Sequence, residues 1–172
     1  MHSVDVRLRE YQQHLFDRIR ASAGSDAASS HLGFEAGGQT WVVRLMDVIE
    51  VIPVPALVSA PLTQDWFVGV ANIRGGLFAI TDFARFANGV PTPITSESRL
   101  VLLHAKYRVH AGLLIGRSLG LRQFTSSPRG YSAASSWQSA PHSDADGRIW
   151  QEVSVQELTR DPRFLQVALQ GV

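Results

Sequence analysis

The sequence of 172 residues contains no cysteine, which excludes a disulfide framework, a thiolate nucleophile and a zinc site built from Cys ligands. Charged residues are also scarce, at 18% of the chain, and 16 basic residues nearly balance 15 acidic ones. Because the charges are so evenly balanced, the sequence lacks the basic surface expected of a nucleic-acid-binding protein. No apolar run approaches the ~20 residues of a transmembrane helix. We therefore expect a cytoplasmic protein that neither inserts into the membrane nor binds nucleic acid.

Signatures of catalysis and cofactor binding are also missing from the sequence. There is no GxSxG elbow, no GxxxxGK[ST] phosphate loop and no GxGxxG fingerprint after an expected strand. The six histidines form neither HxH nor HExxH, and a zinc site requires converging ligands. Asp144 and Asp146 resemble the start of a calcium loop, but no glutamate closes it, so a solvated turn is the better interpretation. We expect no catalytic residue, no cofactor and no bound metal, with an unusual β-barrel enzyme as the alternative.

The first 30 residues are expected to form an extension before the main domain. Val4 to Ala23 is predicted to be an amphipathic helix, because its apolar residues recur at spacings of three and four. This stripe consists of Leu8, Tyr11, Leu15 and Ile19. The helix either packs on the domain or binds a partner. Ala23 to Ser30 is small and polar, so we interpret it as a linker and divide the chain into residues 1–30 and 31–172.

From His31 onwards the pattern is that of an all-β domain, because short apolar segments alternate with turn residues. The expected strands are His31–Ala36, Thr40–Arg44, Asp65–Asn72, Leu77–Asp82, Leu100–His104, Val109–Ile115, Leu119–Phe124 and Arg148–Val155. Leu45–Ile52 is expected to be a helical turn that leads into a further strand. Short helices are expected at Phe83–Ala87 and Val155–Arg160, and Phe164–Leu169 stays open between helix and strand.

Two loops have an irregular composition. Val90–Ser98 contains two prolines and is interpreted as a boundary between two halves of the domain. Thr125–Ser143 is rich in Ser, Ala, Pro and Gly and is predicted to be a flexible loop. Trp137 lies in this loop and is therefore a candidate for an interface with a partner. The other three tryptophans lie in expected β segments and are assigned to the core.

One stretch of the chain resembles a known family. Residues 67–83, FVGVANIRGGLFAITDF, closely resemble the G-x-x-N-x-R-G-x-x-x-P-x-x-D-L signature of CheW-like domains. The segments WVVRLMDVIEVI (41–52), HAGLLI (110–115) and DGR (146–148) are similar to other parts of the family pattern. Ala79 stands where the family has proline, and Gly116 where it usually has an acidic residue. GVANIRG, AGLLI, the ending FLQVA (164–168) and the helical extension are similar to the PilI branch, the adaptors of type IV pilus chemosensory systems.

The resemblance implies a mainly β, CheW-like fold of two linked small five-stranded β-barrels, one built mainly from residues near 45–95 and the other from flanking segments. It also implies a non-enzymatic signal-transduction adaptor that couples a methyl-accepting chemoreceptor to the regulatory domain of a histidine kinase. The PilI branch implies control of twitching motility, and a coupling protein of flagellar chemotaxis is the alternative. A structural scaffold without a kinase partner is a third possibility.

Candidate protein-binding residues follow from the same resemblance. Val48, Gly69 and Leu121 match positions in or beside a groove between the barrels that receives the receptor. Glu50 and Arg74 match an acidic and a basic position of the family, and they would pair if their strands are neighbours. Asn72 can bond nearby backbone in the turn that contains Arg74. Such a pair either pins two strands or holds a geometry that faces a partner.

Removal of residues 1–23 is expected to leave a folded domain, because a linker such as Ala23–Ser30 seldom carries core contacts. The melting temperature of the truncated protein, followed by circular dichroism beside the full chain, checks this. Insolubility or a large fall in melting temperature would show instead that the apolar stripe of the helix covers part of the core.

Overall fold

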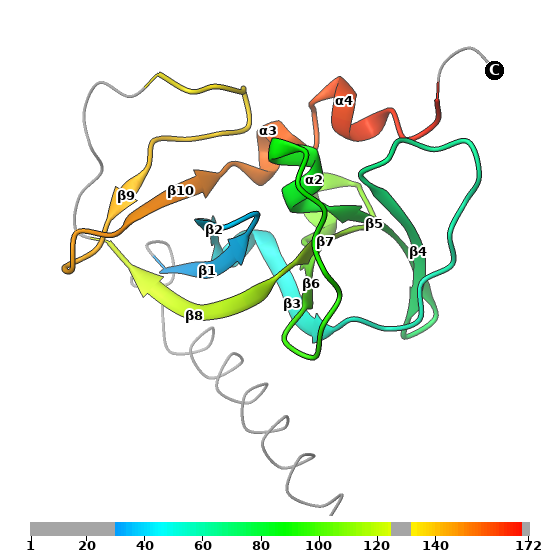
Figure 1. Ribbon diagram of the computed structural model, residues 1–172, viewed down its shortest axis with the longest axis horizontal. Coiled ribbons are helices and arrows are strands. Elements are labelled where there is room, and N and C mark those ends of the chain that lie inside the picture. The colour runs from blue at the N-terminus through cyan, green and yellow to red at the C-terminus, as the bar shows by residue number, and fades with distance from the viewer. Residues whose placement is uncertain (1–29, 125–131, 170–172) are drawn as a thin grey trace, which may run out of the picture.

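A computed structural model describes residues 30–124 and 132–169, which form two five-stranded sheets and several short helices (Figure 1). The expected N-terminal helix and most of the expected linker lie outside the described residues, as does part of the loop expected at 125–143. Within the described ranges, no helix is long and apolar enough to cross a membrane. The prediction of a mainly β domain with two linked five-stranded units is confirmed.

The first sheet joins the two ends of the described chain. Its strand order is β8-β1-β2-β10-β9, and β10 runs parallel to β2. Its strands are β1 (Ser30–Ala36), β2 (Gln39–Arg44), β8 (Arg117–Gln123), β9 (His142–Ser143) and β10 (Ile149–Val153). β1 and β2 form the expected hairpin around Gly37 and Gly38, which both have positive φ. Because β10 pairs with β2, the last strand of the described residues completes a sheet that the first two described strands begin.

The second sheet is built from one continuous stretch of sequence. Its strand order is β3-β6-β7-β5-β4, with β5 and β7 parallel. Its strands are β3 (Val48–Pro53), β4 (Phe67–Ile73), β5 (Gly76–Asp82), β6 (Arg99–Leu103) and β7 (Ala111–Ile115). The short helix η2 (Leu45–Asp47) precedes β3 as expected, and η3 (Ala105–Tyr107) forms the turn of the expected β6–β7 hairpin.

The interpretation of Val90–Ser98 as a boundary between halves is wrong. This loop joins helix α2 (Phe83–Asn88) to β6, and both sides of it belong to the second sheet, which extends to Ile115. Asp82 at the end of β5 fastens the loop, because its carboxylate accepts hydrogen bonds from the amide and the hydroxyl of Thr92 at 2.8 and 2.6 Å. The same carboxylate accepts from the Arg85 amide and so caps α2. The prolines thus shape a tethered turn within one unit.

The two sheets share one hydrophobic core. The main cluster of buried apolar residues includes Phe34 and Trp41 from the first sheet and Val101 and Leu113 from the second. Helices α2, α3 (Val155–Leu158) and α4 (Pro162–Leu165) also contribute buried side chains to this cluster. Figure 1 shows these helices on one side of the molecule, where the two sheets meet. The units are therefore linked by packing as well as by the chain.

The assignment of Trp137 to an interface is wrong, because this side chain is only 1% exposed. Its ring centroid lies 5.8 Å from that of Phe83, 5.7 Å from Phe86 and 6.0 Å from Trp41. The Ser154 amide donates to the Trp137 carbonyl at 2.8 Å, which holds the described part of the loop against the end of β10. The small, polar residues around Trp137 gave the appearance of an exposed segment. Burial of a large aromatic ring supplies the free energy that orders it.

Gly69 lies where the segment after β3 approaches β4 closely. Its φ is +136°, and a Cβ there would lie 2.3 Å from the Val58 carbonyl oxygen. Val58 and Val70 exchange backbone hydrogen bonds of 2.9 and 2.8 Å, so the segment after β3 pairs with β4. This pairing brings the two outermost strands of the sheet order towards each other and curves the sheet.

Gly69→Ala is expected to lower the free energy of unfolding by about 2–5 kcal/mol, because it adds backbone strain and a clash with main-chain atoms that cannot move aside. Gly38→Ala is the matched control, since Gly38 also has positive φ but no atom within 4 Å of the added Cβ, and it should lose only ~1 kcal/mol. Urea denaturation of both variants gives the comparison. Equal losses would contradict the close approach.

Candidate protein-interaction site

Glu50 and Arg74 meet at one corner of the second sheet. Arg74 Nη2 lies 2.8 Å from Glu50 Oε1. Glu50 belongs to β3 and Arg74 to the turn after β4, the two outermost strands of the sheet order. The predicted pairing of these residues is therefore present, and the curvature of the sheet produces it. The side chain of Arg74 is 71% exposed and that of Glu50 only 11%, so a nearly buried carboxylate holds an exposed guanidinium in place.

The turn that carries Arg74 is tightly constrained. Ile73 pairs with Gly76, so Arg74 and Gly75 form a two-residue hairpin loop, with φ of 52° and 84°. Two positive φ angles define a type I′ turn, in which Asn or Gly is preferred at the first position. Arginine there costs about 1–2 kcal/mol of backbone strain. The Asn72 side-chain oxygen accepts from the Gly75 amide at 2.9 Å, which confirms the expected backbone contact and stabilises the turn.

Exposed apolar side chains are found next to the residues of this corner, either adjacent in sequence or paired across strands. Ile49 immediately precedes Glu50 in β3 and is exposed. Leu77 pairs across the β4–β5 hairpin with Asn72 and is 64% exposed. Val58, whose backbone bonds β4, is exposed as well. We call the set Ile49, Glu50, Asn72, Arg74 and Leu77 the β3–β4 corner.

The remaining candidate residues occupy different environments. Val48 is buried in the shared core and pairs with Leu103, so it supports the corner from inside. Gly69 is also buried, against the Val58 backbone. Leu121 is half-buried and lies in β8 at the edge of the first sheet, paired with Leu32. The structure thus brings Glu50, Asn72 and Arg74 together and places Leu121 on the other sheet.

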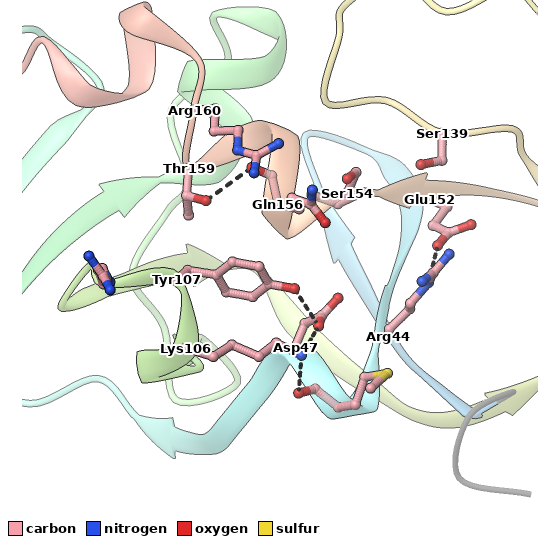
Figure 2. A pocket seen from close by; sticks show the side chains of 13 residues that line it. Arg44, Asp47, Lys106, Tyr107, Ser139, Glu152, Ser154, Gln156, Thr159 and Arg160 are labelled. Carbon is pink, nitrogen blue, oxygen red and sulfur yellow. Dashed lines mark hydrogen bonds and ion pairs between the residues drawn. The ribbon is translucent and has the colours of Figure 1, made fainter. Parts of the chain in front are cut away.

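A polar cavity of about 690 Å³ lies between parts of both sheets (Figure 2). Its lining side chains come from widely separated segments and were not foreseen from the sequence. They include Arg44, Met46, Asp47, Lys106, Tyr107, Arg108, Ser139, Glu152, Ser154, Gln156, Thr159 and Arg160. Both carboxylates already have partners, because Asp47 binds Tyr107 and Lys106, and Glu152 binds Arg44. These bonds make the acidic groups structural.

Asp47 is the centre of the network on one wall of this cavity. Figure 2 shows its carboxylate between the Tyr107 ring and the Lys106 chain. One oxygen, Oδ1, accepts from the Tyr107 hydroxyl at 2.6 Å and pairs with Lys106 Nζ at 2.7 Å. Burial raises the pKa of the Tyr107 hydroxyl, and the hydrogen bond and negative charge of Asp47 raise it further above the ordinary value of 10.0. The network ties η2 to η3.

Three buried side chains of the first sheet form a group that could hold a metal ion. The potential ligand atoms of His31, His142 and Glu152 all lie within 4.8 Å of one another. Burial favours the neutral form of Glu152, but the interactions with the two imidazoles outweigh it and lower the pKa of this carboxyl to about 2. Local histidine spacing gave no sign of this group, because its members come from three strands that the sheet topology brings together.

The sequence profile of the CheW-like domain family matches residues 30–163. The chain therefore belongs to the CheW-like domain family. Protein PilI of Pseudomonas aeruginosa is 34% identical over 95 residues, which cover 55% of this chain and 53% of PilI. Chemotaxis protein CheV3 of Helicobacter pylori is 24% identical over 97 residues, which cover 55% of this chain and 31% of CheV3. The matched stretches thus span about half of one relative and a third of the other.

The fold is also that of a solved structure. The crystal structure of scaffolding protein TtCheW from Thermoanaerobacter tengcongensis superposes with a TM-score of 0.67 at 13% sequence identity. The match covers 80% of this chain and 90% of that chain. At this identity the similarity concerns the fold, and it agrees with the two five-stranded sheets of this protein.

Tyr107 is expected to keep its proton above pH 10 as long as the protein is folded, because its pKa is raised. The unfolded chain would release that proton near 10, so the contribution of Tyr107 to stability is complete below pH 10 and is lost as pH rises through the folded pKa. Tyrosinate absorbance, recorded against pH with ellipticity, measures this. Tyr107→Phe should remove absorbance that appears only with alkaline unfolding. If Tyr107→Phe instead removes tyrosinate absorbance that the folded wild type develops near pH 10, the pKa of Tyr107 is not raised and the prediction is wrong.

Proposed function

We propose that this protein is a non-enzymatic cytoplasmic adaptor that couples a methyl-accepting chemoreceptor to a histidine kinase in the control of twitching motility by type IV pili. Family membership and the similarity to PilI support this proposal. The single observation that carries it is the β3–β4 corner, where an exposed arginine is held in a strained turn by a nearly buried glutamate.

The corner has the properties of a surface that binds protein. A guanidinium offers five donors in a planar fork that suits carboxylates and backbone carbonyls of a partner. The Glu50 carboxylate and the type I′ turn fix its direction before binding, which reduces the entropy lost on association. Ile49 and Leu77 supply exposed apolar area beside it. A residue that strains the backbone at the surface is better explained by such a role than by stability alone.

The proposal assigns different tasks to the candidate residues. Glu50, Asn72 and Arg74 form the contact surface for the kinase regulatory domain or the receptor. Val48 and Gly69 hold β3 and β4 in position beneath it, while Leu121 contributes from the first sheet to the receptor-binding groove. Residues 31–172 are the interacting domain and residues 1–30 an extension of it. This division of labour requires no catalytic group and no cofactor.

A second candidate function is that of a coupling protein in flagellar chemotaxis. The similarity to chemotaxis protein CheV3 favours it, although it covers less of that relative and has lower identity than the PilI match. The two functions differ in their receptors and kinases. Deletion of the gene should abolish twitching and leave swimming intact if the pilus assignment is right, and the reverse phenotype would support the flagellar one.

Arg74→Glu is expected to weaken binding to the receptor signalling domain or the kinase regulatory domain by more than about 20-fold, since a desolvated, unpaired charge at an interface costs on the order of 2–5 kcal/mol. The free energy of unfolding should fall by only about 1 kcal/mol, because the guanidinium is mostly exposed. Isothermal titration calorimetry and thermal melts measure the two effects on one protein preparation.

The control for this experiment is the ion pair Arg85–Asp65, whose Nε and Oδ2 atoms are 3.0 Å apart on another exposed surface. Arg85→Glu should have a similar effect on stability and none on binding. The swap Glu50→Arg with Arg74→Glu tests whether pairing alone matters: restored folding without restored binding indicates a partner-facing role. Normal binding by well-folded Arg74→Glu would remove the β3–β4 corner from the functional surface.

A further inference from the structure

The group His31, His142 and Glu152 is assembled by three strands of the first sheet. His31 lies in β1, Glu152 in β10 and His142 in β9, a strand of only two residues. β9 pairs with β10 through Trp150 and His142, and it is the outermost strand of the sheet. All three residues are buried, at 7–8% exposure. Side chains that are polar and titratable are seldom buried together without a specific reason.

The potential ligand atoms lie within 4.8 Å of one another, close enough for a single ion to reach all three after small rotations. Both histidines direct Nε2 at the same carboxylate, His142 at 2.8 Å from Oε2 and His31 at 3.8 Å from Oε1. Zinc bonds of about 2.0–2.2 Å to imidazole and carboxylate in a tetrahedron place ligand atoms about 3.3–3.5 Å apart. The two observed separations, each to a different oxygen of the carboxylate, lie on either side of that value, so small rotations of the side chains would place both imidazoles at this distance from one ligating oxygen. Two imidazoles and one carboxylate are a donor set that suits zinc.

The Phe124 ring packs against both histidines of the group. Phe124 stacks on His142 with ring centroids 4.7 Å apart, and its ring meets that of His31 edge-on at 5.6 Å. The centroids of His31 and His142 are themselves 5.0 Å apart. These contacts restrict both imidazoles, so less freedom is lost when they bind an ion. Burial of the Glu152 carboxylate also strengthens its attraction for a cation.

An entry path and a competing cation are both present. Glu152 lines the polar cavity, so one member of the group can be reached from it (Figure 2). Arg44 lines the same cavity and its Nε is 3.2 Å from Glu152 Oε1. Its side chain is 57% exposed, so it can turn towards solvent and release the carboxylate. Arg44 thus neutralises Glu152 where a metal ion would otherwise do so.

We propose that His31, His142 and Glu152 form a zinc site that fastens the short strand β9 to β1 and β10. The bound ion connects β9, which follows the 132–141 segment, to the two strands that flank the central strand β2. Its role is structural, because it joins strands that otherwise share few backbone bonds at this edge. The site is independent of the β3–β4 corner and therefore of the proposed adaptor function.

The test uses the full chain without an affinity tag, stripped with chelator and titrated with zinc chloride. One zinc ion per chain is expected, with a rise in melting temperature, since a ligand that binds the folded state stabilises it. His142→Gln and Glu152→Gln should each weaken binding by more than about 100-fold, because loss of a ligand exceeds the 10–100-fold effect of outer contacts. Cobalt in place of zinc should give the visible absorption of tetrahedral coordination, and both variants should lose it.

Two further variants keep the result interpretable. His110→Gln, at an exposed histidine stacked on Phe78, is the matched control and should bind zinc like the wild type. Arg44→Gln removes the competing cation at a mostly exposed position, so it should fold normally and bind zinc more tightly. Absence of stoichiometric zinc binding overturns the proposal. So does unchanged or weaker zinc binding by folded Arg44→Gln, or retention of binding by His142→Gln.

Discussion

The packing of Trp41, Phe83, Phe86 and Trp137 against one another holds the two sheets together. Trp41 comes from the first sheet, Phe83 and Phe86 from the helix that follows β5, and Trp137 from the segment before β9. Edge-to-face and tilted contacts at 4.9–6.0 Å join the four rings. Such contacts add to the large apolar area that each ring buries. Because the rings come from separate parts of the chain, their packing fixes how the sheets, the helices and the cavity are placed.

The geometry of the β3–β4 corner depends on this body through a chain of contacts. Val48 anchors β3 in the shared core, and Gly69 permits the Val58 backbone to pair with β4. These two constraints bring the ends of β3 and β4 together, and only then can Glu50 reach Arg74. The ion pair is therefore a result of sheet curvature more than its cause. Because the guanidinium is mostly exposed, the pair should add little to stability, which is consistent with a surface that serves a partner.

Local features of the fold were predictable from the sequence. Two hairpins are predicted by glycine-containing turns at Gly37-Gly38 and Arg74-Gly75, where positive φ is needed. Alternating apolar residues identify the flanking strands. The pairing of Glu50 with Arg74 and the bond from Asn72 also followed, from a family motif and the chemistry of a turn. In these cases the residues that decide the structure are close in sequence or belong to one recognisable pattern.

Features that depend on long-range packing were not predictable. Composition marked Val90–Ser98 as a boundary, but the Asp82 carboxylate ties it into one sheet. Trp137 stands among small polar residues, and only the Phe83 and Phe86 rings show where it belongs. The polar cavity and the group His31, His142 and Glu152 arise because the sheet order brings distant strands together. Pattern analysis within a short window contains no information on such pairings.

The parallel pairing of β2 with β10 has a consequence for how the protein folds during its synthesis. The Thr40 hydroxyl donates to the Ile149 carbonyl across 109 residues, whereas all strands of the second sheet lie between Val48 and Ile115. As the chain leaves the ribosome, the second sheet is available in full while the β1–β2 hairpin still lacks its parallel neighbour. Folding of the first sheet must therefore wait for nearly the whole described chain, and β2 exposes an unpaired edge until β10 has been synthesised.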